Sequence, residues 1–334
     1  MISPLKASIL LAAAVTARSH CKAHTQHPAP TSASISVIPT STPVIPSSSA
    51  IPTPSSTPIR NPSYAHRIFH DFRNLDDTGS LYNGEPAQIE TDEESSSATV
   101  QEGYLTSSAF TNDFRIQTWG SPVTGDTPIR KEYSNGNVYI RETPSASPVH
   151  RGHQRDEETS QTHLVLRAHR NADFVSSGEI DTTVSNIFHA SITVRARVRG
   201  DAGTCAGIFT YFDDNNESDI EILTRDPTNH IRYTNQPGLD ADGNEIPEAS
   251  SDVELLNGAV WTEWHDHRID WTPELSAWYL DGEVATTKTY GIPQEPSTVI
   301  INMWGDGGLW TGDIAVGAAA YLEIQWIEIL YNTA

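Results

Sequence analysis

The sequence predicts an all-β protein whose strands form a two-sheet β-sandwich. Short segments in which apolar and polar residues alternate recur along the chain, as expected for half-buried strands. Turns that contain Gly, Pro and Asn separate these segments. No segment carries a long, capped apolar pattern with a period of 3.6 residues, so helices are not expected to form the framework.

The first segment, residues 1–17, has the features of a secretory signal peptide. Lys6 precedes a short apolar run, Ala7–Val15, and small residues follow this run. We expect cleavage after residue 17 or as late as residue 23. The run is far shorter than the ~20 residues of a membrane span. The protein is therefore expected to be secreted and extracellular, either free or associated with a cell wall.

The second segment, residues 24–62, is a linker rich in Ser, Thr and Pro. Between Pro28 and Pro62 there are nine Pro and fourteen Ser or Thr in 35 residues, and Arg60 is the only charged side chain. A chain of this composition cannot bury a core. We expect an extended, disordered and O-glycosylated spacer.

The third segment, residues 63–334, is expected to be a single β-sandwich domain. The chain of 334 residues carries 21 basic and 43 acidic residues, a net charge of −22, and all the acids lie after residue 62. This balance argues against a nucleic-acid partner, which would need clustered cations. The two cysteines, Cys21 and Cys205, lie on opposite sides of the linker, so no disulfide framework is expected. We expect a monomer with no membrane partner.

Two acidic or polar stretches, Asp76–Gln101 and Pro144–Thr162, are expected to be surface loops of this domain. The strands come mainly after the second loop. Their ranges, in chain order, are Leu164–Ala168, Ile192–Arg199, Cys205–Phe212, Glu217–Leu223, His267–Trp271, Ala277–Leu280, Thr298–Trp304 and Tyr321–Tyr331. Asp281-Gly282 follows one of them as a hairpin turn.

One predicted strand carries the residues that we expect to perform chemistry. On an extended strand Glu217, Asp219 and Glu221 project from one face, while Ile220 and Ile222 point into a core. The same acid spacing occurs in residues 90–94, but three serines follow there and no apolar alternation indicates a strand. We therefore interpret residues 90–94 as a solvated loop and the Glu217 strand as the candidate site.

Paired carboxyl groups at this spacing suit the cleavage of a glycosidic bond. One carboxylate attacks the anomeric carbon and the other protonates the leaving oxygen, and a retaining mechanism needs them roughly 5–5.5 Å apart. Four strand residues separate the α-carbons of Glu217 and Glu221 by about 13 Å, so both side chains must lean over Asp219. Three like charges this close cannot all ionise readily, so the cluster should retain a proton.

The segment Glu217-Ser218-Asp219-Ile220-Glu221 resembles the ExDxE signature of glycoside hydrolase family sixteen, which contains licheninases, laminarinases and related transglycosylases. Further segments resemble family motifs in the same chain order. They are Ser177–Ile180, Ile208–Tyr211, Trp264–His265, Ile269–Pro273, Trp278–Gly282 and Ile301–Trp304. Ser218 stands where the family usually has an aliphatic residue.

The resemblance implies a concanavalin A-like jelly-roll sandwich of two curved antiparallel sheets with a concave sugar-binding cleft. It also implies retaining hydrolysis of β-glucans, with Glu217 as nucleophile, Asp219 as its helper and Glu221 as acid/base. The single residue between Asp219 and Glu221 favours relatives that act on mixed-linkage glucan or transfer sugars.

Sugar rings present C–H faces that stack on aromatic side chains, so a glucan-binding cleft should contain Trp and Tyr. Tyr211, His265, Asn302 and Trp304 match cleft positions of the family. Trp119 and Trp310, each in a loop that contains glycine, are expected to add further sugar contacts.

We expect no metal and no cofactor. His265 and His267 lie on one strand face but lack a third ligand at a recognisable spacing. Family members often bind a structural calcium through an Asp in the last strand, and neutral Gln325 stands at this place here. Asn216-Glu217-Ser218 is an N-glycosylation sequon, but a glycan would block the cleft, and we expect the sequon to be unused.

The sequence thus predicts a secreted retaining endo-β-glucanase that hydrolyses β-1,3 or mixed β-1,3/1,4 linkages, with a polysaccharide as its partner. Two alternatives stay open. A transglycosylase of the same fold would transfer the cleaved sugar chain to another sugar, and a lectin-like domain would bind glycans without cleaving them.

Overall fold

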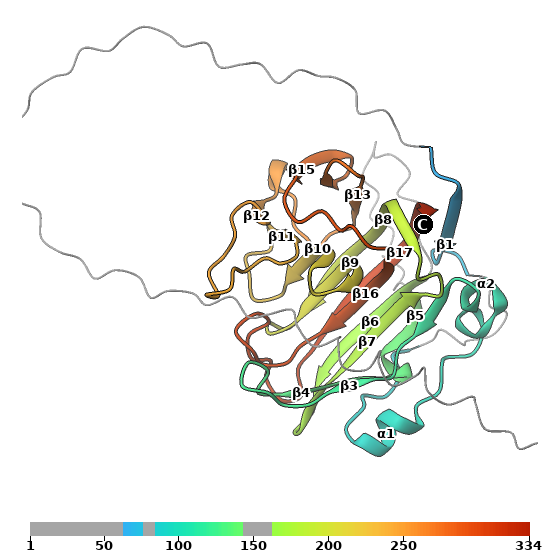
Figure 1. Cartoon of the computed structure of the whole chain (residues 1–334). Coiled ribbons are helices and arrows are strands. Elements are labelled where there is room, and N and C mark those ends of the chain that lie inside the picture. Colours follow the sequence, from blue (N-terminus) through green and yellow to red (C-terminus); the bar gives the residue numbers. More distant parts are fainter. Residues whose placement is uncertain (1–62, 76–83, 143–161) are drawn as a thin grey trace, which may run out of the picture. The chain divides into compact units, whose positions relative to one another are not determined.

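The computed structural model describes residues 63–75, 84–142 and 162–334 (Figure 1). The predicted signal peptide, the linker and nearly all of the loop predicted at Pro144–Thr162 lie outside the described residues. In the described part, strands predominate and the helices are short, which confirms the prediction of an all-β fold. Tyr64–Ala334 belong to one compact unit.

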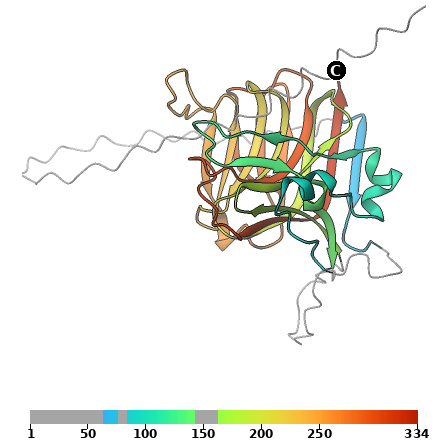
Figure 2. The ribbon, with the colours of Figure 1, turned by 90° about the horizontal axis from the view of Figure 1, so that it is seen from below.

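The strands form two antiparallel layers, which we call sheet A and sheet B. Sheet A contains, in spatial order, β5 (Val138–Glu142), β6 (Thr162–Arg170), β17 (Ala319–Thr333), β8 (Ile187–Gly200), β13 (His265–Trp271), β14 (Ser276–Leu280) and β15 (Glu283–Lys288). β1 (His66–Asp71) pairs with the C-terminal half of β17 and lies beside it at the edge in Figure 2. The predicted two-sheet arrangement is therefore confirmed.

Sheet B contains, in spatial order, β2 (Phe114–Ile116), β7 (Phe174–Thr182), β16 (Thr298–Trp304), β9 (Cys205–Asp213), β10 (Asn216–Leu223), β11 (His230–Asn235) and β12 (Ser250–Glu254). β7 also pairs with β6 and with β4 (Arg130–Tyr133), and β4 pairs with β3 (Gly120–Ser121). The N-terminal half of β7 therefore connects the two sheets.

The helical elements are α1 (Asp92–Ser97), α2 (Ser108–Thr111) and three single-turn 3₁₀ segments, Tyr104–Thr106, Asn135–Asn137 and Leu256–Gly258. The prediction of a loop over Asp76–Gln101 is wrong at α1. Thr91 accepts a hydrogen bond from the backbone N–H of Glu94, and the Glu94 carboxylate accepts one from the N–H of Thr91. This reciprocal capping box holds a short helix among acidic residues that we interpreted as a solvated loop.

Strand alternation is clearest in β8, where Ile192, Val194, Ala196 and Val198 are fully buried and the residues between them are half-buried. These residues and the buried side chains of sheet B form one hydrophobic core. After β14, Asp281 and Gly282 adopt φ values of 51° and 85°, which confirms the predicted hairpin turn.

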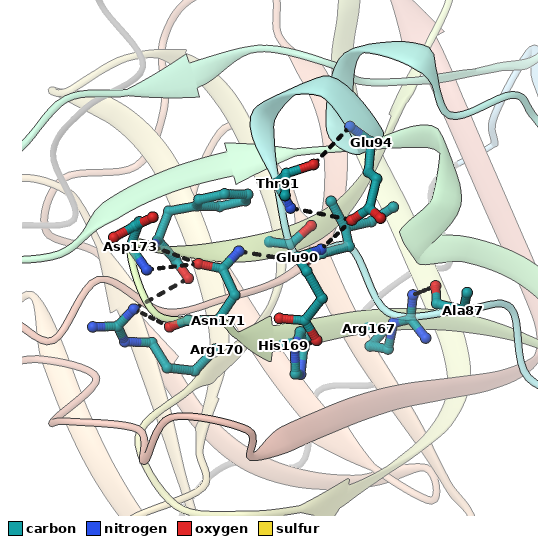
Figure 3. A network of polar contacts seen from close by, with 12 residues as sticks. Ala87, Glu90, Thr91, Glu94, Arg167, His169, Arg170, Asn171 and Asp173 are labelled. Atoms are coloured by element: carbon teal, nitrogen blue, oxygen red, sulfur yellow. Dashed lines mark hydrogen bonds and ion pairs between the residues drawn. The ribbon is translucent and has the colours of Figure 1, made fainter.

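β6 departs from the half-buried pattern that the sequence predicts, because both of its faces are buried. Residues 85–90 cover one face. The guanidinium of Arg167 donates to the carbonyl oxygen of Pro86 at 2.7 Å. It also donates to the carbonyl oxygen of Ala87 at 2.9 Å, and His169 contacts Glu90 at 3.0 Å (Figure 3). Polar residues that alternate with Leu164 and Leu166 thus bind a covering segment rather than water.

A buried ion cluster spans neighbouring strands of sheet A. The carboxylate of Glu323 on β17 lies 2.5 Å from Nε of Arg197 and 3.7 Å from Nε2 of His163. Burial would raise the pKa of Glu323, but its hydrogen bonds and charge interactions with His163 and Arg197 outweigh burial and hold the pKa at about 2.

We predict that Glu323→Gln destabilises the fold by on the order of 3 kcal/mol at neutral pH. A depressed carboxyl pKa contributes stability above the unfolded-state value and loses it as the pH falls through the folded-state value. The difference between variant and parent should therefore shrink as the pH falls from about 4.5 towards 2. Urea denaturation across this range measures the effect.

The control is Glu328→Gln on the same strand, because Glu328 pairs with Arg67 at 2.8 Å in a solvent-exposed position. That change should cost less than about 1 kcal/mol. If the two variants lost the same free energy of unfolding, the stabilising role assigned to the buried ion cluster would be contradicted.

Candidate active site: a carboxylate cleft on sheet B

β10 presents its acids to a cavity and its aliphatic side chains to the core. Ile220 and Ile222 are buried in the hydrophobic core. Glu217, Asp219 and Glu221 line a cavity of about 60 Å³ on the other side of the strand. The predicted division of this strand into a carboxylate face and a core face is therefore confirmed.

The cavity floor is a row of residues that crosses four strands. Glu221 on β10 pairs with Gly207 on β9, Gly207 pairs with Asn302 on β16, and Asn302 pairs with Glu179 on β7. Their shared register brings residues from distant parts of the chain to one face of sheet B. All four line the cavity.

Gly207 is needed in this row because neighbouring side chains lie close to its α-carbon. A Cβ atom at this position would lie 2.7 Å from Oδ1 of Asn302 and 3.3 Å from the ring of Phe209. Any side chain here would therefore displace Asn302 or Phe209. The glycine thus allows the side chains of Asn302 and Phe209 to lie close to the backbone of β9.

Glu179 is a buried carboxylate fixed by hydrogen bonds. Trp119 donates from Nε1 to Oε1 at 2.7 Å, and Asn302 donates from Nδ2 to Oε2 at 3.1 Å. Asn302 also donates to the hydroxyl of Tyr133 at 3.3 Å. Glu179 thus orients two side chains that border the cavity.

The catalytic candidates Glu217 and Asp219 are almost fully removed from water, with exposures of 3% and 1%. Burial raises the pKa of Glu217 well above its usual range, and the neighbouring charge of Asp219 and a hydrogen bond between the two carboxyls raise it further. Burial and the charge of Glu221 likewise raise the pKa of Asp219. The pair therefore holds a proton near neutral pH.

Donors from other segments hold two of the carboxyl groups in place. Gln236, just after β11, donates from Nε2 to Oδ2 of Asp219 at 3.1 Å. Trp310 donates from Nε1 to Oε1 of Glu221 at 2.7 Å, and the thiol of Cys205 donates to the same oxygen at 3.7 Å. Burial raises the pKa of Cys205, so its thiol stays protonated.

The structure brings most of the predicted site residues together. Tyr211, Trp119, Asn302 and Trp304 line the cavity with the three acids of β10. Trp310 joins them through its hydrogen bond to Glu221.

His265 does not join this group, and its predicted place in the cleft is wrong. It lies on β13 of sheet A, pairs with Ala196 of β8, and contacts Asp281 at 2.6 Å through Nδ1. Strand alternation located His265 on a strand but gave no information on which sheet that strand joins.

Sequence reasoning did not assign Glu179, Lys131, Tyr133 or Gln236 to the site. Glu179 carried a usable signal, because it lies in Ser177–Ile180, one of the segments that resemble family motifs. Lys131 and Tyr133 lie on β4, a short strand with no clear apolar alternation. Gln236 lies outside any strand.

A model of known families, described as Glycosyl hydrolases family 16, matches residues 144–328 of the chain. This protein belongs to glycosyl hydrolases family 16. The resemblance on which the sequence analysis relied is thereby confirmed, and the two-sheet fold agrees with it.

Two curated relatives of this family 16 chain are similar over part of their length. The chain is 27% identical to Crh-like protein 2 of Aspergillus fumigatus over 219 residues, 59% of this chain and 45% of that protein. It is 28% identical to a β-glucanase of Paenibacillus polymyxa over 164 residues, 46% of this chain and 64% of that enzyme. The chain thus spans about half to two thirds of these relatives.

Among solved structures, a Bacillus licheniformis β-glucanase superposes with a TM-score of 0.48 and 19% sequence identity. The match covers 67% of this chain and 94% of that one. Within the described residues 63–75, 84–142 and 162–334, no helix is long and apolar enough to cross a bilayer.

A second cavity of about 420 Å³ lies beside the first in this family 16 domain, and Glu221 lines both. Arg232, Gln236, Ser250 and Trp310 also line the second cavity. Arg232 is fixed by Asp226 at 2.8 Å and lies over the ring of Trp310 at 5.1 Å. The carboxyl of Glu221 therefore borders both cavities.

The residues at the family's calcium position do not fit a cation. Gln325 is neutral, and its Oε1 accepts a hydrogen bond from Nε of Arg195 at 2.9 Å. The donor to this side chain's oxygen is thus a cation, whereas calcium takes oxygen ligands that are mostly carboxylates and carbonyls. In the part of the chain that the structure describes, no group of three His, Cys, Asp or Glu side chains is placed to hold a metal.

The sequon at the proposed nucleophile has its asparagine engaged. Asn216 donates from Nδ2 to Asp213 at 2.9 Å and accepts from the backbone N–H of Gln294 at 3.0 Å. Both polar atoms of the Asn216 side chain are thus hydrogen-bonded within the protein.

We predict that Glu217→Gln makes the protein more resistant to alkaline pH. A carboxyl with a raised folded-state pKa stabilises the fold below its unfolded-state pKa, and this contribution is lost as the pH rises through the folded-state value. The Tm of the variant should therefore exceed that of the parent by a margin that grows to a few degrees as the pH rises from the unfolded-state pKa towards the raised folded-state pKa. Glu93→Gln on the exposed face of α1 is the control, and parallel Tm curves for Glu217→Gln and the parent would contradict the raised pKa.

Proposed function

We propose that this protein is a retaining endo-β-glucanase that hydrolyses β-1,3 or mixed β-1,3/1,4 linkages. The observation that carries the proposal is the placement of Glu217, Asp219 and Glu221 along one buried strand face above a cavity. Buried carboxyl groups that share a proton meet the needs of glycoside cleavage, where one group attacks and another donates a proton. Similarity to enzymes named β-glucanase supports the substrate class.

In the first step, the ionised carboxylate of Glu217 attacks the anomeric carbon and forms a glycosyl–enzyme ester. The bond from that carbon to the leaving oxygen breaks, and the protonated carboxyl of Glu221 gives its proton to that oxygen. In the second step, Glu221 removes a proton from water, and the water oxygen attacks the anomeric carbon. The ester bond to Glu217 breaks, so two inversions leave the anomeric configuration unchanged.

Asp219 links the two glutamates in this proposal. It lies between them on β10, shares a hydrogen bond with Glu217 and interacts electrostatically with Glu221. We assign to Asp219 the transfer of the retained proton from the Glu217 side to Glu221 when substrate enters. Gln236 donates to Oδ2 of Asp219 and keeps its carboxyl between the two glutamates during this transfer.

The cleft walls suit the binding of sugars. Trp119 and Tyr211 offer aromatic surface, while Asn302 and Glu179 offer hydrogen-bonding groups from the floor. We assign to this cavity the sugar that carries the reacting carbon. The signal-like residues 1–17 and the linker at 24–62 support the further proposal of a secreted, extracellular enzyme.

We predict that Glu217→Gln lowers kcat for laminarin or lichenan at least about 1,000-fold, because the nucleophile is lost. Release of reducing sugar measures the effect, and NMR of the first products should show the β-anomer in the parent. Glu93→Gln should match the parent. Activity retained in Glu217→Gln would exclude the assigned role, and binding of glucan without turnover by the parent would favour a lectin-like protein.

A transglycosylase is the second candidate, and the cavity of about 420 Å³ beside Glu221 favours it. A sugar acceptor bound there would place a hydroxyl near Glu221, which would remove its proton as it would from water. The hydroxyl oxygen would then form the new glycosidic bond as the ester to Glu217 breaks. Products longer than the donor would result.

We predict that Ser250→Phe lowers the ratio of transfer to hydrolysis at least about fivefold, because the ring fills the acceptor cavity. Mass spectrometry of products from a laminari-oligosaccharide donor with added acceptor measures this ratio. Leu256→Phe, exposed outside the cavity, is the control. An unchanged ratio in Ser250→Phe would argue that no acceptor binds in this cavity.

A further inference from the structure

Trp304 is an aromatic residue of the cleft that a sugar cannot freely reach. It lines the cavity, yet only 5% of its surface is exposed. Trp304 packs with Tyr133, Cys205 and Leu223, and Nζ of Lys131 on β4 lies 4.2 Å from the centroid of its ring. An ammonium at this distance is attracted by the π electrons of the ring and covers one of its faces.

Two other rings hold the same ammonium. Nζ of Lys131 lies 5.5 Å from the ring centroid of Trp119 and 5.6 Å from that of Tyr133. These two rings are themselves 4.8 Å apart, and the Trp119 indole is fixed by its hydrogen bond to Glu179. Lys131 therefore occupies a preformed aromatic recess at one end of the cavity.

The charge of the cavity favours this position. Glu179 and the three acids of β10 line it, and Lys131 is the one basic residue among the described residues that do so. Its neighbours on β4, Arg130 and Glu132, instead pair with each other at 2.5 Å. The ammonium of Lys131 is thus held by both the rings and the negative potential of the cleft.

A sugar and the ammonium compete for the same surface. The C–H face of a pyranose stacks on an indole ring, and Nζ of Lys131 lies over the ring face that such stacking would use.

We propose that Lys131 determines specificity by shielding Trp304, so that this end of the cleft lacks a stacking site for one sugar of the glucan. This inference rests on the proposed function, since it concerns which glucans the cleft binds well. Removal of the ammonium creates the missing stacking site and extends the cleft.

The kinetic test uses the full chain and laminari-oligosaccharides of increasing length. Lys131→Ala should lower KM for the longer substrates about threefold to tenfold and leave KM for the shortest cleaved substrate unchanged, because only longer chains reach Trp304. Lys131→Arg restores a cation over the ring and should return the length dependence of the parent. Arg268→Ala, which removes a cation 3.8 Å from the Tyr279 ring on sheet A, is the matched control.

A second readout needs no glucan activity. Oxidation of tryptophans by N-bromosuccinimide, mapped by mass spectrometry of peptides, measures the accessibility of each ring. Trp304 should be oxidised several-fold faster in Lys131→Ala than in the parent or in Lys131→Arg. Trp326 on sheet A should react equally in all three and serves as the internal control.

A raised KM for all substrates in Lys131→Ala would overturn the proposal, because the ammonium would then be a direct sugar contact. Unchanged oxidation of Trp304, or faster oxidation with unchanged length dependence, would also overturn it. If the parent cleaves no glucan, the proposed function fails while the oxidation rates still decide whether Lys131 shields Trp304.

Discussion

Three carboxyl groups on one strand, removed from water and close together, impose the constraint around which sheet B is built. Each ionised group loses its hydration on burial and repels the other two, so neighbouring residues must supply protons or hydrogen bonds. Gln236 after β11 and Trp310 after β16 donate these bonds, although both lie far from β10 in the sequence. The pairing of β9, β10 and β11 therefore packs the hydrophobic core and also helps to bring hydrogen-bond donors to the buried carboxyl groups.

The orientation of β10 was predictable because one of its faces is apolar and packs in the core, while the other face carries the acids. Ile220 and Ile222 required a core, and this requirement placed Glu217, Asp219 and Glu221 on the opposite face. The same reasoning gave the bounds of β16 correctly, Thr298–Trp304. Alternation is informative wherever one face of a strand is apolar and the other is not.

The alternation of apolar and polar residues does not show which strands become neighbours in a sheet. The wrong prediction for His265 comes from this limit. His265 was assigned to the right strand but to the wrong side of the sandwich, because strand order depends on contacts between distant segments. Lys131 lies on β4, whose four residues are too few to show an alternation of apolar and polar side chains. On β6, Arg167 and His169 read as solvent-facing residues, yet a separate segment covers them. The helix α1 was readable from Thr91 and Glu94, but the surrounding acids suggested a loop.

Gly207 gives the cleft a floor without a side chain at its centre. A Cβ atom there would lie 2.7 Å from Oδ1 of Asn302, so the floor can pack this closely only around a residue without a side chain. With the floor fixed in this way, discrimination among polysaccharides is expected to come from the walls, which β4 and the residues after β16 supply. These walls can diverge in sequence while the paired strands beneath them, and the carboxyl groups that they align, stay the same.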